Sequence, residues 1–122
     1  MKYCSECGSE TEKKIPEGDN RERDCCRSCG LIHYSNPKII VGTIPAKNKS
    51  VLLCKRAIEP RYGKWTLPGG FLENGETVAQ GAFRETFEET NTEVEMNELY
   101  AIFNVPQINQ VYMLYRASVV SN

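Results

Sequence analysis

Three glutamates, Glu85, Glu88 and Glu89, crowd one short segment of this 122-residue chain. On an α-helix they would fall within about 100° of one another, and like charges at these spacings repel by about 0.2–0.5 kcal/mol per pair. Carboxylates that cannot separate take up protons or bind cations, and donor sets of oxygen alone suit hard divalent ions such as Mg²⁺ or Mn²⁺. The segment therefore predicts a metal site, with a solvated acidic helix face as the alternative.

A Mg²⁺ or Mn²⁺ site of this kind suits the chemistry of phosphates. Mg²⁺ usually shares its coordination shell with substrate phosphates, and a spare carboxylate could take the proton of an attacking water. The glycine turn before the helix could add the carbonyl of Gly70 as a ligand, and Arg84 could hold Glu88 one helical turn away. Three nearby cations are candidate phosphate contacts, with ordinary surface charge as the alternative: Arg56, Arg61 and Lys64.

Four of the six cysteines form two pairs at metal-ligand spacing. Cys4 and Cys7 stand in CSECG, and Cys26 and Cys29 stand in CRSCG. Two thiolates on one tight turn can face the same Zn²⁺, and two such turns complete a closed structural site. Disulfides are the alternative pairing, and Cys25 could replace Cys26 only with a poorer spacing to its partner. We therefore predict a four-cysteine zinc site.

Composition and charge exclude several classes of protein. Hydrophobic residues make up 40% of the chain and charged residues 25%, which indicates a packed domain. No apolar run approaches the length of a membrane helix, and the N-terminal MKYCSECG lacks the apolar region of a secretory signal. The net charge of −1 gives no general attraction to nucleic acid or to membranes. We expect a cytoplasmic protein with reduced cysteines and no membrane partner.

The elements that carry the cysteines are predicted within residues 1–36, as two short strands around a PEGDN turn. A piece this small buries little surface, so a metal would replace the core. Its six Lys/Arg and seven Asp/Glu do not favour phosphate backbones. We therefore expect a structural or subunit-contact module, with a nucleic-acid reader as the alternative. His33, the single histidine, is expected to pack or link and not to bind zinc.

The elements that carry the glutamates follow a break at Asn36–Pro37, over residues 37–122. KIIVGTI and VLLCKR predict a hairpin over residues 39–56, and WTL predicts a short strand. LYAIFNV and QVYMLYRASVV predict two more strands around a PQIN turn. With one helix among these strands, the unit is predicted to be an α/β (α+β) domain.

The helix is predicted over residues 77–90, with Thr77 or Asn74 as its cap. Phe83 and Phe87 are expected to be the heavy anchors of its buried stripe, and the glutamates occupy the neighbouring stripe. Gly81 lies on the glutamate side, where a helix glycine costs about 1 kcal/mol relative to alanine. The glycine either makes space beside the carboxylates or is simply tolerated.

Residues 70–92 resemble the Nudix box, with the pattern G-x5-E-x7-R-E-U-x-E-E-x-G-U, where U is a bulky apolar residue. The matching positions are Gly70, Glu76, Arg84, Glu85, Glu88 and Glu89. Thr86 and Thr92 replace apolar residues, and Asn91 replaces the last glycine but tolerates the left-handed conformation of a helix end. With KWTLPGGF and the cysteine segment, the chain is similar over essentially its whole length to Nudix hydrolases that carry an N-terminal zinc ribbon.

This resemblance implies a mixed sheet with a catalytic helix, and hydrolysis of a nucleoside diphosphate linked to another moiety, such as FAD, ADP-ribose or NADH. It implies that Glu85 and Glu89 hold Mg²⁺ or Mn²⁺, with Glu88 as a further ligand or the general base. Arg84 would orient these catalytic residues, and Glu76 would support the loop. The alternative is a catalytically silent domain that binds a nucleotide and regulates a partner.

The family's fold normally continues past the last predicted strand, through another strand and a closing helix. We expect these elements to be absent from residues 37–122, so that VYMLYRASVV lacks cover on one face. A truncated sequence, an unusual gene product, or cover from a second subunit, as in a homodimer, would each account for this.

Overall fold

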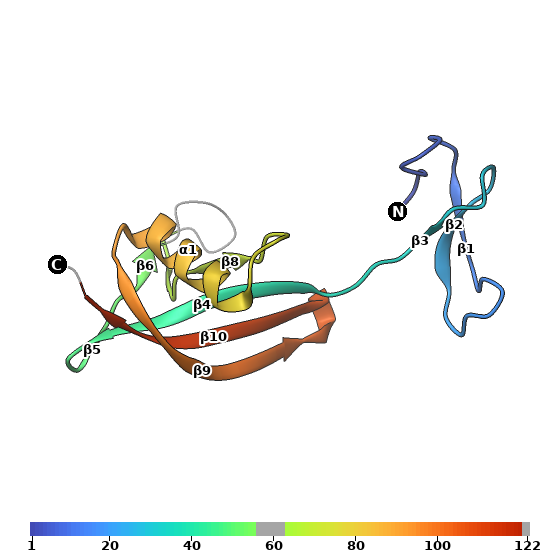
Figure 1. The fold of residues 1–122 in the computed structure, drawn as a ribbon. Coiled ribbons are helices and arrows are strands. Elements are labelled where there is room, and N and C mark those ends of the chain that lie inside the picture. The colour runs from blue at the N-terminus through green and yellow to red at the C-terminus, as the bar shows by residue number, and fades with distance from the viewer. Residues whose placement is uncertain (56–62, 121–122) are drawn as a thin grey trace. The chain divides into compact units, whose positions relative to one another are not determined.

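The computed structural model describes residues 1–55 and 63–120, which fall into two compact units, Met1–Asn36 and Pro37–Asn122. The first unit is a three-stranded antiparallel sheet in the order β1-β2-β3 (Figure 1). Its strands are β1 (Thr11–Lys14), β2 (Arg23–Cys26) and β3 (Ile32–His33). The PEGDN turn between β1 and β2 is closed by a 3.0 Å bond from the Asp19 N–H to the Pro16 carbonyl. The two predicted strands and their turn are confirmed.

The second unit is built on a mixed five-stranded sheet. Four strands have the order β5-β4-β10-β9, and β8 pairs with the Ile40–Gly42 segment of β4, whereas β5 pairs with its last two residues. Its strands are β4 (Lys38–Lys47), β5 (Ser50–Val51), β8 (Gly69–Phe71), β9 (Val94–Val105) and β10 (Gln110–Val119). β10 runs parallel to β4 and antiparallel to β9. This mixed sheet, with helix α1 (Val78–Thr90) packed on it, confirms the predicted fold class.

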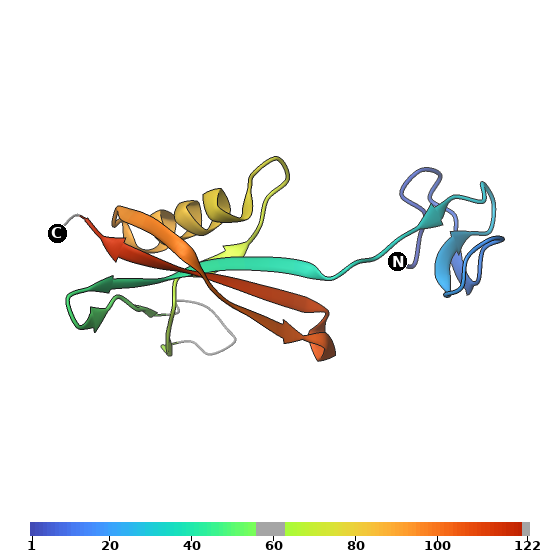
Figure 2. The ribbon, with the colours of Figure 1, turned by 60° about the horizontal axis from the view of Figure 1, so that its bottom comes forward.

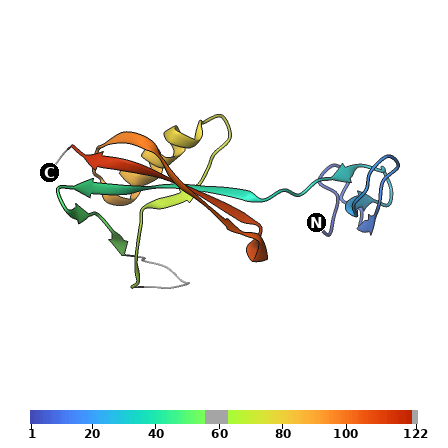
Figure 3. The same cartoon turned by 90° about the horizontal axis from the view of Figure 1, so that it is seen from below.

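The long pair β9 and β10 twists along its length (Figures 2 and 3). The two strands are joined by the short 3₁₀ helix η1 (Pro106–Ile108), which ends at Asn109 with a φ of 54°. The PQIN turn expected between two strands is therefore confirmed. β9 and β10 both contact α1, so this pair of strands forms part of the sheet surface on which the helix packs.

The predicted hairpin over residues 39–56 is wrong beyond its first two pairs. β5 pairs with β4 only at Val51 and Ser50. The Leu52 N–H still donates to the Pro45 carbonyl at 2.8 Å, but a proline has no N–H to donate back, so the ladder stops. The chain then forms β6 (Cys54–Lys55), which pairs with β7 (Trp65–Thr66) as a separate two-stranded sheet.

Helix α1 has 13 residues and begins at the predicted cap, Thr77. The Thr77 hydroxyl accepts from the Gln80 N–H at 3.1 Å, and the Gln80 side chain accepts from the Thr77 N–H at 2.8 Å, which is a capping box. The helix ends at Asn91, whose φ of 52° is left-handed, as predicted. In the part of the chain that the structure describes, no helix is long and apolar enough to cross a bilayer.

The buried face of α1 differs from the predicted one. Phe83 and Phe87 are 38% and 43% exposed, so they are not the anchors of the helix. Its buried residues are the small ones, Gly81, Ala82 and Thr86. Small side chains let a helix approach a sheet closely, and α1 makes its most extensive contacts with β4. The glutamate side of the helix is thereby drawn toward the sheet.

Candidate active site and zinc site

The four predicted zinc ligands converge in the first unit. Their sulfur atoms all lie within 4.8 Å of one another. The Sγ atoms of Cys4 and Cys29 are 3.7 Å apart, and those of Cys7 and Cys26 are 3.4 Å apart. Tetrahedral Zn–S bonds of 2.3 Å place sulfurs about 3.8 Å apart, so the residues fit zinc. All six cysteines are free, and Cys25 is buried outside this cluster.

Backbone amides of the two turns point at the sulfurs. Cys26 Sγ accepts from the N–H groups of Cys29 and Ser28, each at 3.3 Å. These two bonds, that from Cys29 first, lower the pKa of the Cys26 thiol to about 6. In the other turn, Cys4 Sγ accepts from the Glu6 N–H at 3.4 Å. The turn of Cys26 therefore stabilises a thiolate, which is the form that binds zinc.

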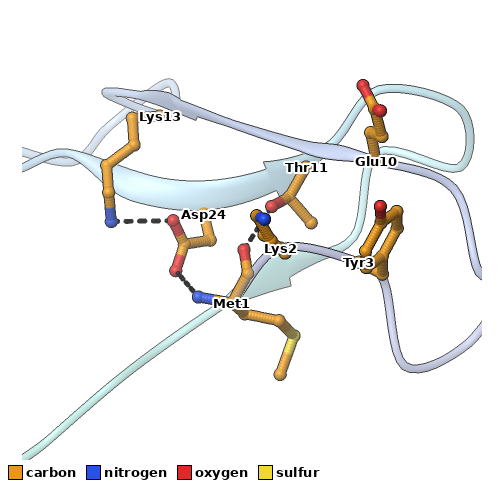
Figure 4. A pocket seen from close by; sticks show the side chains of 7 residues that line it. All are labelled: Met1, Lys2, Tyr3, Glu10, Thr11, Lys13 and Asp24. Atoms are coloured by element: carbon orange, nitrogen blue, oxygen red, sulfur yellow. Dashed lines mark hydrogen bonds and ion pairs between the residues drawn. The ribbon is translucent and has the colours of Figure 1, made fainter.

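The same unit holds a hollow of about 430 Å³, shown in Figure 4, in which one carboxylate, that of Asp24, is paired with two amines. It is lined by Met1, Lys2, Tyr3, Glu10, Thr11, Lys13 and Asp24. Asp24 accepts from Lys13 Nζ at 2.8 Å and from the Met1 amine at 2.9 Å. The bond from Lys13, followed by that from the amine, lowers the pKa of Asp24 to about 2. This pairing ties the N-terminal segment to β1 and β2.

In the second unit, the glutamates of α1 meet Gly69 and Gly70, the predicted glycine turn, which the structure forms as the first two residues of strand β8. Glu89 Oε1 accepts from the Gly69 N–H at 2.9 Å. A Cβ on Gly70 would lie 2.3 Å from Glu85 Oε2, so the carboxylate occupies the space that the glycine leaves open. Sequence reasoning named Gly70 for its carbonyl but missed the amide of Gly69. This close approach of two carboxylates to a backbone turn gives an oxygen-only donor set, which fits a hard divalent cation.

Arg84 connects the glutamates to the loop before the helix. Its Nε and Nη2 bond the two oxygens of Glu76 at 3.0 and 2.7 Å, and Nη2 also donates to the Phe71 carbonyl at 3.1 Å. Nη1 reaches Glu85 at 2.8 Å and Glu88 at 3.3 Å. The expected pairing with Glu88 is present, but the two-point bond to Glu76 is shorter. These acids, Glu76 first, raise the pKa of Arg84.

Glu76 is fixed from two sides. Besides Arg84, its Oε1 accepts from the Glu73 N–H at 2.8 Å. The bonds from Arg84 and then from Glu73 lower the pKa of Glu76 to about 2. Gly81 lies beneath this pair, because a Cβ there would lie 2.7 Å from Leu72 Cδ1 and 2.8 Å from Glu76 Oε1. Gly81 thus makes space for Leu72 and Glu76, and not beside the three helix glutamates, where the space was predicted.

The three glutamates of α1 do not converge as the cysteines do. Within residues 1–55 and 63–120, the four cysteines are the only group of three or more potential ligands that gathers within 4.8 Å. Glu85 and Glu88 both turn toward Arg84, while Glu89 bonds the turn at Gly69. Glu85 is 15% exposed and Glu88 is 57% exposed at the side chain. The carboxylates therefore differ in both partners and burial, although they share one side of the helix.

The predicted phosphate contacts are only partly within the described residues. Arg56 and Arg61 fall outside them. Lys64 is exposed, one residue before β7. Cys54, on the paired strand β6, is close enough to Glu89 for the carboxylate charge to add to burial in raising the pKa of this thiol to about 11. Cys54 of β6 therefore lies near Glu89.

Comparison with known families assigns both units. Residues 2–35 match the zinc-ribbon family described as Nudix N-terminal, and residues 37–122 match the NUDIX domain. An ADP-ribose pyrophosphatase of Methanocaldococcus jannaschii is 38% identical over 73 residues, which are 60% of this chain and 43% of that protein. The NAD-capped RNA hydrolase NudC of Haemophilus influenzae is 35% identical over 98 residues, which are 77% of this chain and 35% of that protein. The chain thus spans less than half the length of these curated relatives.

Solved structures give the same assignment. A NUDIX hydrolase from Nitrosomonas europaea superposes with a TM-score of 0.94 at 58% identity, over all of this chain and 69% of that one. A bifunctional NMN adenylyltransferase/ADP ribose pyrophosphatase from Francisella tularensis, complexed with AMP and a Mn ion, superposes with a TM-score of 0.62 at 27% identity. That match covers 70% of this chain and 28% of the other. The resemblance drawn from residues 70–92 is confirmed.

Proposed function

Because the chain belongs to the Nudix family, we propose that it hydrolyses the pyrophosphate bond of a nucleoside diphosphate linked to a second moiety, with Mg²⁺ or Mn²⁺. The observation that carries this proposal is the contact between α1 and the glycine turn, with Glu85 against Gly70 and Glu89 bonded to Gly69. A bound divalent cation would neutralise phosphate charge and activate a water at this place. The carboxylates would supply its ligands.

The residues have distinct proposed roles. Glu85 and Glu89 hold the cation, because they are the carboxylates that touch the turn. Glu88 is 57% exposed at the side chain and bonds Arg84, so it serves as a further ligand or as the general base. Arg84 orients Glu85 and Glu88, and its two-point bond to Glu76 holds the loop against the helix. Gly70 offers its carbonyl.

The substrate class follows from the chemistry of the site and the names of the relatives. One relative is named an ADP-ribose pyrophosphatase and another a NAD-capped RNA hydrolase, and ADP-ribose and NAD both contain a diphosphate that bears a nucleoside. FAD, ADP-ribose, NADH and a NAD-capped oligonucleotide are therefore the candidates. Arg56, Arg61 and Lys64 remain predicted phosphate contacts. The homodimer and the cytoplasmic location also remain predictions.

A substrate panel tests this proposal. The zinc-loaded chain is incubated with each candidate and Mg²⁺ or Mn²⁺, and the products are separated by chromatography. We expect a nucleoside monophosphate and a second phosphate product from at least one substrate. Binding without turnover across the panel would instead indicate the silent regulator.

The variant Glu89→Gln adds a direct test of the site. Loss of this carboxylate should lower kcat by roughly 10²–10⁴-fold while the helix signal in circular dichroism stays unchanged. Glu95→Gln, an exposed change of the same charge on β9, is the matched control. Unchanged turnover in Glu89→Gln would remove this residue from the mechanism.

A further inference from the structure

Two buried threonines join the helix that carries the glutamates to the strand beneath it. Thr43 on β4 and Thr86 on α1 are both fully buried, and among residues 1–55 and 63–120 they are the buried polar residues. Their hydroxyl oxygens are 2.6 Å apart, although the residues are 43 positions apart in the chain. Thr86 stands where the Nudix box has an apolar residue. A directed polar bond therefore replaces packing that is otherwise non-directional.

The direction of this bond follows from the neighbours. The Thr86 hydroxyl is 2.8 Å from the Ala82 carbonyl, which can only accept, so its single proton is used there. Thr43 must then donate its proton to Thr86. The chain Thr43 → Thr86 → Ala82 carbonyl leaves neither buried hydroxyl proton without an acceptor. It also fixes the rotation of α1 about its axis, because only one register brings Thr86 over Thr43.

The same residue of β4, Thr43, also bonds the chain immediately before the glycine turn. The Thr43 N–H donates to the Pro68 carbonyl at 3.2 Å, immediately before Gly69. A Cβ on Gly42 would lie 2.4 Å from that carbonyl oxygen, so the backbones of β4 and the turn are as close as a glycine allows. Thr43 thus bonds the turn through its backbone and the helix through its side chain. Both sides of the glutamate site are fastened to this one residue.

We propose that the Thr43–Thr86 hydroxyl pair is a positioning device that sets where Glu85 and Glu89 stand relative to the Gly69–Gly70 turn. It therefore sets the affinity of the site for a divalent cation. Thr86 is next to Glu85 in the chain and three residues before Glu89, so a shift at Thr86 moves both carboxylates. This inference rests on the proposed function, in that it takes the glutamates as cation ligands. Both threonines act through the glutamates and are positioning residues.

Valine substitutions separate positioning from packing, because valine keeps the shape of threonine and removes only the hydroxyl. The probe is Mn²⁺ itself, titrated into the zinc-loaded chain and followed by the electron paramagnetic resonance signal of the free ion. Thr86→Val removes the acceptor of Thr43 and should raise the Kd for Mn²⁺ roughly 10–100-fold. Thr43→Val leaves the Thr86–Ala82 bond intact and should raise the Kd for Mn²⁺ by a smaller factor. Thr86→Ser keeps the hydroxyl and should restore the wild-type Kd.

Thr90→Val is the matched control on the same helix. Its hydroxyl donates to the Thr86 carbonyl at 2.6 Å, a bond within the helix that does not reach the sheet. Its Kd for Mn²⁺ should stay near that of the wild type. Circular dichroism at the titration temperature establishes that each variant is folded, and Thr43→Val with Thr86→Ser decide the matter if Thr86→Val does not fold.

The outcomes distinguish this inference from the proposed function. If folded Thr86→Val and Thr43→Val bind Mn²⁺ as the wild type does, the threonines are only structural and the inference is overturned. Failure of the wild type to bind Mn²⁺ overturns it as well. If the wild type binds Mn²⁺ but cleaves no substrate in the panel, the proposed function fails. The graded Kd values then still decide the role of the threonines.

Discussion

The two units of this protein present their candidate metal ligands in opposite ways. In the ribbon, Cys4, Cys7, Cys26 and Cys29 already lie at the separations that one zinc ion requires. In the Nudix unit, the carboxylates are spread between an arginine and a backbone turn. The first arrangement leaves no position for a substrate. The second keeps separate oxygens that substrate and water can share with a cation.

The difference teaches how far each site depends on the rest of its fold. Each cysteine pair and the amides that bond it belong to a single turn, so a few consecutive residues are sufficient. The glutamates reach their place only because α1, β4 and β8 are packed together. Metal should therefore hold the ribbon together, whereas the Nudix unit should fold without metal and then bind it.

Removal of zinc is the strongest test of that contrast. A structural zinc site supplies about 10–16 kcal/mol of apparent binding energy at pH 7, and residues 1–36 have little core to replace it. Chelation should abolish amide protection across the ribbon in hydrogen-exchange mass spectrometry and leave residues 63–120 protected. Metal analysis should give one zinc per chain. Equal protection of the ribbon before and after chelation would contradict this view.

Two glycines test whether the Nudix unit separates folding from ligand placement. The three atoms nearest to an alanine Cβ at Gly70 all belong to the Glu85 side chain, the closest at 2.3 Å, so the carboxylate should move while the fold persists. We expect Gly70→Ala to lower kcat roughly 10²-fold, as a misplaced catalytic group does, with the urea midpoint nearly unchanged. Turnover at the wild-type rate would show that the position of Glu85 is unimportant.

Gly42→Ala is the counterpart that should act on folding. Its Cβ meets the Pro68 carbonyl oxygen at 2.4 Å and the Gly69 Cα at 3.1 Å, which are backbone atoms that cannot rotate away. Overpacking of this kind costs about 1–3 kcal/mol. The urea midpoint, measured from the circular dichroism signal of the helix, should therefore be lower in Gly42→Ala and nearly unchanged in Gly70→Ala.

The same contrast explains what the sequence could predict. Cysteine spacing and the helix caps Thr77 and Asn91 are local signals, and the structure confirms the cluster and both caps. Which face of α1 is buried is not decided by local sequence. A periodic stripe of apolar residues does not say which of its edges the sheet will cover. Phe83 and Phe87 were therefore predicted wrongly as anchors.

The residues that sequence reasoning missed depend on strand pairing. Thr43 and Gly69 act in the site only because β4 pairs with β8, a contact between distant segments. Two signals were nevertheless present. Gly42 interrupts a strand of β-branched residues, which often marks a close backbone approach. Thr86 places a hydroxyl in an apolar stripe, where a buried partner is required.

The smallest expected effect is on the stability at low pH, where one carboxylate from each unit can be compared. Glu76 and Asp24 each have a pKa lowered to about 2, from ordinary values of 4.5 and 3.8. A carboxylate with a lowered folded pKa contributes stability that is complete above its unfolded pKa and is lost as the pH falls toward its folded pKa. For Glu76 this window runs from about pH 4.5 down to about pH 2.

Because the described α-helix lies in the Nudix unit, its circular dichroism signal reports that unit and not the ribbon. The urea midpoint of this signal should fall between about pH 4.5 and about pH 2 in the wild type, and it should fall less steeply in Glu76→Gln. At neutral pH the urea midpoint of Glu76→Gln should thus lie below that of the wild type, and the difference between the two midpoints should shrink as the pH falls. Asp24→Asn should leave this slope unchanged, since Asp24 bonds only within the ribbon. Equal slopes in Glu76→Gln and the wild type would mean that the Glu76–Arg84 pair does not stabilise the unit, and that the loop is held by the Phe71 carbonyl and packing around Gly81 instead.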